Sequence, residues 1–183
     1  MTKKEKVIFW AKENYVYIAG FLLPFFIMTI VCIICKVVPF GDESLSIIDG
    51  LHQYMPFFAE YHEKIRNLDS FYYSWNGGLG YNFISLWAYY LSSPLNLLLV
   101  LLPKTALPMG FSWLLVLKIS LTGLTTAAFF IHRSNKNNWK VLIISTSFAL
   151  SNYMIGYSWN IMWMDAILMF PLIIIGFDKL MKD

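Results

Sequence analysis

Residues 18–35 read IAGFLLPFFIMTIVCIIC, and no side chain in this run is charged. A helix of about 20 apolar residues is long enough to cross the hydrocarbon core of a bilayer. Four lysines precede the run, at positions 3, 4, 6 and 12. The run is too long for the core of a signal peptide, and no small-residue cleavage site follows it. We therefore predict an uncleaved spanning helix over residues 15–38, with its N-terminus in the cytoplasm.

The composition of the whole chain agrees with a lipid environment. Of its 183 residues, 58% are hydrophobic and 14% are charged, whereas soluble domains are about 45–50% apolar and about 25% charged. The composition therefore excludes an ordinary soluble domain and a disordered chain. The net charge of +3 is too small and too scattered to indicate nucleic-acid binding. A chain of this length has room for about four or five spanning helices.

Three further apolar segments follow, at residues 109–131, 141–156 and 166–180. The first of them contains a single charged residue, Lys118. The link 132–140 contains three Lys or Arg residues, and such short basic links are typical of the cytoplasmic side. We therefore predict one all-α integral membrane domain with four transmembrane helices, at residues 15–38, 109–131, 141–156 and 166–180.

The number of crossings places a long first loop outside the cell. If the N-terminus and the link 132–140 are both cytoplasmic, an even number of crossings separates them. The helices 15–38 and 109–131 already supply two. We therefore predict that the apolar segment 83–102 does not cross, since Pro94 divides it into pieces too short to span. Residues 39–108 then form an extracytoplasmic loop that carries surface-lying helices, and residues 157–165 form a second outer loop.

The charges of the chain agree with this orientation. The segments predicted to be cytoplasmic contain nine Lys or Arg residues and four acids, whereas the two outer loops contain three Lys or Arg residues and seven acids. An excess of Lys and Arg on the inner side is what the positive-inside rule requires.

The first outer loop contains a segment, residues 50–67, with the spacing of an amphipathic helix lying on the membrane surface. Its apolar face consists of Leu51, Tyr54, Met55, Phe58, Tyr61 or His62, and Ile65. Its other positions include Gln53, Glu60, Glu63 and Lys64. Farther along, nine of the twenty residues from 71 to 90 are aromatic. Such a segment is typical either of the lipid headgroup region or of a surface that stacks on sugar rings.

Two acids and one lysine are the candidate functional charges. Asp49 opens the amphipathic helix, where its carboxylate can cap the helix or take a proton from an acceptor hydroxyl, and the two roles are compatible. Asp165 lies at the outer end of two apolar spans, so it either marks a helix start or finds water, a cation or a distant partner. Lys118 either extends its amine to the interface or pairs with a carboxylate or a lipid phosphate.

Other motifs in the sequence give weaker indications of function. Cys32 and Cys35 are spaced like a redox or zinc pair, but they lie in an apolar helix without a nearby histidine, which favours packing. The sequence has no phosphate-cradling loop and no Gly-x-Ser-x-Gly motif, so ATP-driven and serine-hydrolase chemistries lack support. Asp42 and Glu43 form an exposed acid pair that is either solvated or holds a divalent metal, and no other cofactor is indicated.

Four segments together resemble the YfhO family of bacterial multipass membrane proteins, which belongs to the broad GT-C class of glycosyltransferases. In chain order they are DGLHQYMPFF (residues 49–58), YSWNGGLGYN (73–82), YYLSSPLN (89–96) and WNIMWMD (159–165), the last followed by Pro171 and Leu172. These segments follow one another in the family's order and cover nearly the whole chain.

The resemblance implies an enzyme of the bacterial plasma membrane that moves a sugar from a polyprenyl-phosphate carrier to a cell-envelope polymer, such as lipoteichoic acid, on the outer face. It implies that Asp49 is the base and that Asp165 is a second acid of the same cavity. The substrate-binding residues expected from the quoted segments, and from the depth of Lys118, are Lys118, His52, Gln53, Tyr54, Trp75, Asn76, Tyr90, Asn96 and Trp159.

Two further expectations concern the scope of this function. Members of the family are longer, so we expect the chain to be an N-terminal fragment that is inactive alone. The alternatives to an enzyme are a non-enzymatic subunit or flippase-like component, which binds a lipid-linked sugar without breaking a bond, and a plain membrane scaffold.

Overall fold

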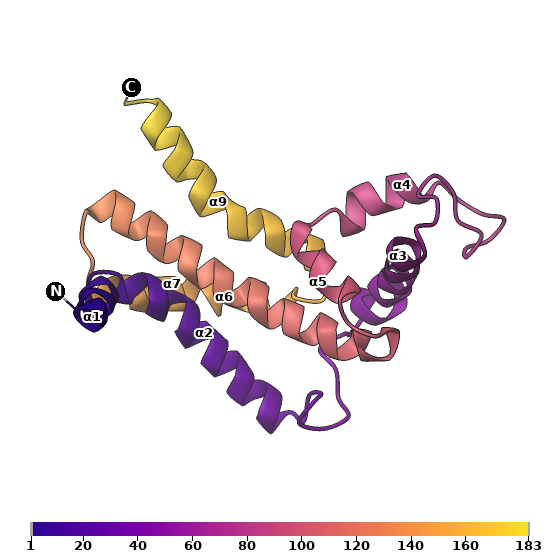
Figure 1. Ribbon diagram of the computed structural model, residues 1–183, viewed down its shortest axis with the longest axis horizontal. Coiled ribbons are helices and arrows are strands. Elements are labelled where there is room, and N and C mark those ends of the chain that lie inside the picture. Colours follow the sequence, from indigo (N-terminus) through magenta and orange to yellow (C-terminus); the bar gives the residue numbers. More distant parts are fainter. Residues whose placement is uncertain (1, 183) are drawn as a thin grey trace. The chain divides into compact units, whose positions relative to one another are not determined.

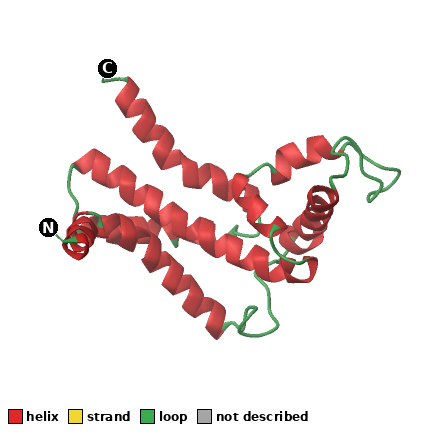
Figure 2. Cartoon of the chain, in the orientation of Figure 1, coloured by secondary structure: helices red, strands yellow, loops and turns green. Residues whose placement is uncertain are grey.

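The computed structural model describes residues 2–182, and within that range it contains helices and loops but no strand (Figure 2). The chain forms two compact units. The first unit is made of the chain up to Val31, of Val116–Ser158 and of the chain from Trp163 onward. The second unit is made of Cys32–Leu115 and Trp159–Met162. Both units therefore combine segments that are far apart in the sequence.

Three helical runs are long and apolar enough to cross a membrane (Figure 1). They are α2 (Tyr15–Ile34), the run Lys104–Ser134 that contains α6 (Leu107–Ser134), and α9 (Ile161–Leu180). The all-helical class is thus as predicted, and three of the four predicted transmembrane helices coincide with these candidate spans. α9 begins before the predicted residue 166, so Asp165 lies within this helix and not in a loop that precedes it.

The predicted third span, residues 141–156, is interrupted in the structure. α7 (Trp139–Ala149) ends, and the hydroxyl of Ser151 then accepts a hydrogen bond from the Met154 amide and opens α8 (Asn152–Gly156). The segment therefore differs from the single helix predicted, because a serine in the N-cap position is a start signal within an otherwise apolar run. Neither helix has the length of a straight span, so a crossing here stays a prediction.

The apolar segment 83–102 is bent. One arm consists of α4 (Phe83–Leu86) and the π-helical turn η2 (Trp87–Leu91), and the other consists of η3 (Pro94–Asn96) and α5 (Leu97–Val100). The chain bends by 101° between the two arms, which is the geometry of a broken span or a re-entrant segment. Pro94 starts the second arm as the sequence suggests, while the non-crossing of this segment stays a prediction.

Small residues let α2 and α6 approach closely within the first unit. A Cβ atom at Gly123 would lie 2.2 Å from the carbonyl oxygen of Gly20, and one at Gly20 would lie 2.9 Å from Cβ of Ala127. Gly123 and Ala127 are four residues apart on α6, which is the small-xxx-small spacing of tightly packed membrane helices. Val16 and Val141 are buried beside Ala127, so α7 joins the same packed region.

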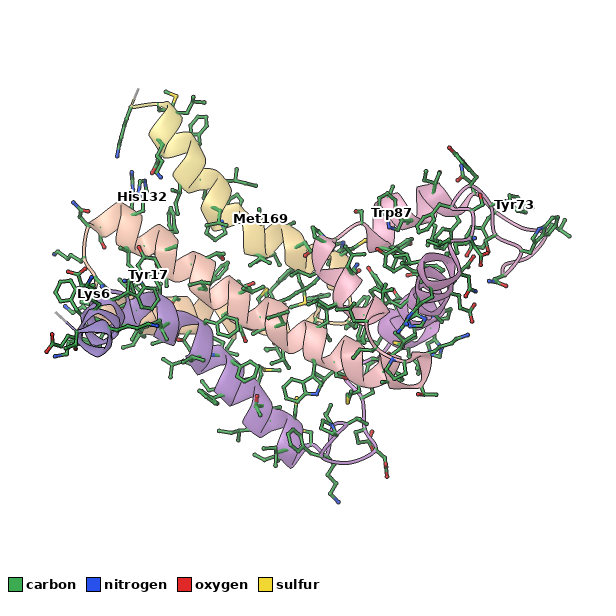
Figure 3. The ribbon with its side chains drawn as sticks, viewed as in Figure 1. Lys6, Tyr17, Tyr73, Trp87, His132 and Met169 are labelled. Carbon is green, nitrogen blue, oxygen red and sulfur yellow. The ribbon has the colours of Figure 1, made fainter. Side chains whose placement is uncertain are left out.

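The segments predicted to be cytoplasmic lie together in the first unit. The Tyr15 hydroxyl, at the start of α2, donates to the carbonyl oxygen of Asn137 in the link between α6 and α7. At the end of α6, His132 (Figure 3) and Arg133 lie 3.7 Å and 3.5 Å from Oδ2 of Asp178 in α9. α1 (Lys3–Glu13) precedes this region and starts with a capping box. The membrane face that this end occupies stays a prediction.

In the second unit the π-helical turn η1 (Gly50–Tyr54) runs directly into α3 (Met55–Asn67). Tyr54 and Phe58 are buried as the amphipathic pattern predicts, but Leu51 of the same predicted face is exposed. The surface position of this helix on a membrane stays a prediction.

Two charged residues of α3 are buried although the periodicity assigned them to its polar side. Glu60 and Lys64 form an ion pair with 3.7 Å between Nζ and Oε1. The Lys64 amine also donates to the carbonyl oxygens of Ser70 at 2.7 Å and of Tyr73 at 2.9 Å. The loop 68–82 therefore covers the polar side of α3, which periodicity alone does not predict.

That loop has a defined shape. Its two limbs are joined by a bridge between Ser74 and Tyr81, and the Tyr73 hydroxyl (Figure 3) donates to the Leu79 carbonyl oxygen at 2.9 Å. Gly80 has φ +94°, and a Cβ atom there would lie 1.9 Å from the Tyr73 hydroxyl oxygen. Only glycine fits this position.

Candidate functional site

The first candidate feature is an ion pair between two long helices of the first unit. Nζ of Lys118 in α6 donates to Oδ2 of Asp165 in α9 at 2.6 Å. The lysine side chain is fully buried, whereas the aspartate side chain is 28% exposed. Lys118 therefore pairs with a carboxylate, one of the two roles predicted for it, and its amine does not extend to an interface. Asp165 has a distant partner in Lys118, which is one of the alternatives predicted for it.

Buried hydroxyls follow Lys118 along α6, but they bond within their own helix. The Thr122 hydroxyl donates to the Lys118 carbonyl oxygen at 2.9 Å, and the Ser120 hydroxyl donates to the Val116 carbonyl oxygen at 2.7 Å. These hydrogen bonds to the preceding turn satisfy the hydroxyl donors within α6. A hydroxyl also carries no charge that could neutralise the lysine. The Asp165 carboxylate is therefore the group that balances the buried ammonium.

The second candidate feature lies in the second unit, where two π-helical turns meet. Gln53 on η1 donates from Nε2 to the hydroxyl oxygen of Tyr90 on η2 at 3.1 Å. The ring of Tyr90 also makes an edge contact with Tyr54, with 5.5 Å between centroids. π-Helical turns often occur at functional sites because they displace side chains from regular helical positions. Three of the predicted substrate-binding residues are thus brought together.

Tyr54 is fixed by a partner that the sequence does not suggest. Its hydroxyl donates to Oδ1 of Asn160, just before α9, at 2.6 Å, and both residues are buried. Burial raises the pKa of the Tyr54 phenol well above its ordinary value, and the charges of Tyr90 and Asp49 raise it further. Tyr54 therefore acts as a neutral hydrogen-bonding group. Asn160 joins the site although it belongs to none of the predicted site residues.

Asp49 stands at the start of η1 with an exposed carboxylate. Its side chain makes no capping hydrogen bond to this turn, so the capping role considered for it is wrong. The preceding residue, Ile48, has φ +50°, which is strained for a β-branched side chain. The following residue, Gly50, is buried, and a Cβ atom there would contact Phe111 and Trp159 at 3.4 Å and 3.5 Å. The backbone thus packs inward beside Asp49 while the carboxylate faces outward.

The other predicted binding residues are distributed more widely. Trp159 is half-buried beside Gly50, and His52 is exposed on η1. Trp75 and Asn76 are exposed on the loop 68–82, where the Trp75 ring packs against Tyr73.

Asn96 does not lie at a surface that a substrate can reach. It is buried, and its Nδ2 donates to the Leu91 carbonyl oxygen at 3.1 Å, which holds the bend between the two arms of segment 83–102. Asn96 therefore has a structural role at this bend, and its predicted binding role stays a prediction.

No group of three or more His, Cys, Asp or Glu side chains able to hold a metal ion occurs among residues 2–182. The described part of the chain therefore gives no support to the divalent metal considered for Asp42 and Glu43. Cys32 is buried and Cys35 is exposed, and both are free thiols.

A family model described as "Bacterial membrane protein YfhO" matches residues 19–183. The chain belongs to the YfhO family. Comparison with curated proteins gave no match, and comparison with solved structures gave none either.

Membership of the YfhO family confirms the resemblance carried by the four quoted segments, all of which lie inside the matched region. It makes the chain a bacterial membrane protein in contact with the lipid bilayer. The family description names a location and no reaction.

Proposed function

We propose that this YfhO-family chain forms part of a membrane glycosyltransferase. The enzyme would transfer a sugar from a polyprenyl-phosphate carrier to a cell-envelope polymer of the lipoteichoic-acid type on the outer face. The observation that carries this proposal is the Lys118–Asp165 pair, because a fully buried cation in an apolar helix has a partly exposed carboxylate as its partner. Ionisable groups at membrane depth are costly and mark ligand or ion sites.

In this proposal Lys118 receives the phosphate of the carrier. The phosphate of a lipid-linked sugar is an anion at the edge of the lipid, and an ammonium stabilises the negative charge that grows on it as the sugar leaves. Asp165 holds the lysine amine in position before the donor binds. When phosphate replaces it as the counter-ion, the 28% exposed carboxylate can turn to water at little cost.

Asp49 serves as the general base. Its exposed carboxylate makes no capping hydrogen bond and is therefore available to take the proton of an acceptor hydroxyl. The acceptor oxygen forms a bond to C1 of the sugar as the bond from C1 to the phosphate oxygen breaks. The proton ends on Asp49 and the electron pair ends on polyprenyl phosphate, so the reaction balances without a further reactant.

The neutral groups of the second unit suit the recognition of a sugar. Gln53 and Tyr90, which are half-buried, offer hydrogen bonds without charge, while the fully buried Tyr54 packs against the ring of Tyr90. Partly exposed aromatic rings such as Tyr90 offer faces that pack on the apolar side of a pyranose. Since the donor already carries a leaving phosphate, a phosphate-cradling loop for a nucleotide is unnecessary, in agreement with the sequence.

The test is the Asp49→Asn variant in the protein expressed from its own gene. We expect sugar incorporation into the envelope polymer to fall by about a hundredfold or more, as is typical when a general base is lost, while the lipid-linked sugar accumulates. Asp69→Asn, which alters another exposed acid of the same predicted outer loop, is the matched control and should incorporate sugar like the wild type. Unchanged incorporation in Asp49→Asn would contradict the assignment of the base.

A further inference from the structure

A pocket that is lined by neither Tyr54 nor Asn160 lies beside α3 in the second unit. Its volume is about 310 Å³, near the lower limit of pockets that hold small ligands. Three segments line it: α3, the loop 68–82, and the short helix η4 (Lys104–Ala106). Its polar lining consists of Glu60, Glu63, Asn76, Tyr81 and Lys104, and its apolar lining includes Phe57.

The two carboxylates of the pocket are each balanced by a lysine. Glu60 pairs with Lys64 behind it, and Glu63 pairs with Lys104 at the rim. Lys64 does not line the pocket, but together with Lys104 it balances the two lining carboxylates, so the net charge of these four side chains is zero. A phosphate would meet two carboxylates, and an ammonium ion would meet the Lys104 amine. The electrostatics of the pocket thus favour a neutral ligand.

The same groups form a set of hydrogen-bonding partners with fixed positions. The Tyr81 hydroxyl donates to Oε2 of Glu60 at 2.7 Å, and burial together with this carboxylate raises the pKa of Tyr81, so the phenol keeps its proton. The Lys64 amine is held by the carbonyl oxygens of Ser70 and Tyr73. The loop 68–82 is thereby held against α3. The pocket is built in advance of any ligand, which lowers the entropy cost of binding.

The polar groups that line the pocket can form further hydrogen bonds with the hydroxyl groups of a ligand. Carboxylate oxygens accept more than one hydrogen bond, and a carboxamide both donates and accepts. The backbone amide of Asn76 donates to Ser74, while its carboxamide has no protein partner among residues 2–182. The ring of Phe57, which packs on Tyr90 at 5.1 Å between centroids, supplies an apolar surface beside these acceptors.

We propose that this pocket, lined by Glu60, Glu63, Asn76 and Phe57, is a subsite for an uncharged sugar residue. The subsite deepens the proposed function and rests on it only for the source of the sugar, which is the growing acceptor polymer. Hydroxyls of the sugar donate to the carboxylates and to Asn76, and its apolar face packs on Phe57. The subsite thus holds one sugar residue of the acceptor chain on the second unit.

Saturation-transfer NMR on the purified protein in nanodiscs tests this subsite. The probes are the methyl glycosides of glucose, galactose and N-acetylglucosamine, with glucose 6-phosphate as the charged probe. We expect at least one neutral glycoside to bind and glucose 6-phosphate to bind more weakly. Glu63→Gln and Asn76→Ala should each weaken neutral sugar binding about five- to tenfold, the value of one or two lost hydrogen bonds.

Leu79→Ala is the matched control, because Leu79 lies on the same loop, is 94% exposed and does not line the pocket. It should bind the neutral probe like the wild type, and the elution profile of each variant in nanodiscs verifies folding. Absence of neutral sugar binding, preference for glucose 6-phosphate, or wild-type binding in Asn76→Ala would each overturn the subsite. Asp49→Asn should keep the sugar bound, so loss of transfer with intact binding separates a failure of the catalytic proposal from a failure of the subsite.

Discussion

Lys118 Nζ lies 2.6 Å from Asp165 Oδ2, and the two residues are separated by 47 positions in the chain. The two side chains differ in burial, because the lysine is fully buried and the aspartate is 28% exposed. An ion pair inside a protein has no large net effect on stability, but removal of one partner leaves the other uncompensated. The two single variants should therefore have different effects.

Asp165→Asn should destabilise the protein more than Lys118→Met. The first leaves a buried ammonium without its counter-ion, which costs about 3–5 kcal/mol, whereas the second leaves a carboxylate that is only partly buried. Thermal unfolding in detergent, followed by tryptophan fluorescence, measures the difference. The double variant Lys118→Met with Asp165→Leu should recover most of the loss. Equal destabilisation by the two single variants would contradict the unequal burial.

Lys118→Met should also weaken the binding of a polyprenyl-phosphate sugar by about tenfold or more, since a charge-assisted hydrogen bond contributes about 1.5–3 kcal/mol. Binding to the protein in nanodiscs can be measured by quenching of tryptophan fluorescence. Lys118→Arg keeps the cation and should retain part of the affinity. Wild-type affinity in Lys118→Met would leave the lysine with a structural role only.

Gly123→Ala tests the close packing of α2 on α6. The added methyl group would lie 2.2 Å from the Gly20 carbonyl oxygen, so the helices must separate, at a cost of about 1–3 kcal/mol. Gly176→Ala on α9 is the control, because no atom lies within 4 Å of a Cβ atom there. That control should be neutral or stabilising by up to about 1 kcal/mol. A lower melting temperature in the control than in Gly123→Ala would refute this packing.

Alkaline pH should destabilise the second unit. Burial raises the pKa of Tyr54, Tyr61 and Tyr81 above the ordinary value. Each phenol therefore contributes stability that is complete below the unfolded pKa of about 10 and is lost as the pH rises toward the folded value. Melting temperatures from about pH 8 to about pH 11 should fall, and the fall should be smaller in Tyr54→Phe.

The variant Tyr72→Phe provides the comparison, since Tyr72 is exposed and should show the wild-type dependence on pH. Tyr54→Phe should also lose about 1 kcal/mol at neutral pH, because Oδ1 of Asn160 loses its donor. A pH dependence that is identical in the wild type and in Tyr54→Phe would show that this phenol does not titrate as described.

The predicted orientation can be tested by labelling single cysteines introduced at positions 79, 105 and 135 after Cys32 and Cys35 are replaced by alanine. Positions 79 and 105 should react with a membrane-impermeant maleimide added to intact cells, and position 135 should react only after lysis. If position 105 is protected from outside while position 79 reacts, the bent segment 83–102 crosses the membrane.

The sequence predicts the long helices well because the evidence for them is local. The charge-free run 18–35 and the single charge within 109–131 are sufficient to place α2 and α6. Hydropathy does not predict the interruption between α7 and α8, because the helix-start residue Ser151 lies within an otherwise apolar run. The burial of Glu60 and Lys64 is missed because helical periodicity assigns charges to solvent, whereas here they pair beneath the loop 68–82.

Individual residues of the candidate site are predictable from the sequence, whereas the contacts between them are not. The depth of Lys118 and the isolation of Asp165 both indicate that each needs a partner, but only the fold shows that they satisfy each other. Asn160 is separated from Tyr54 by 106 positions and belongs to no pattern that sequence periodicity reveals. The π-helical turns that bring Gln53 to Tyr90 likewise have no local signature.

The proposed glycosyltransferase activity can be measured as transfer of a radiolabelled sugar from a polyprenyl-phosphate sugar to an envelope-polymer acceptor, in proteoliposomes that contain the purified protein expressed from its own gene. We expect the wild type to form labelled polymer and one equivalent of polyprenyl phosphate, and Asp49→Asn to bind the donor but form neither product. Donor binding or movement between leaflets without any labelled polymer, in the wild type, would contradict this expectation and would favour a flippase-like or binding subunit.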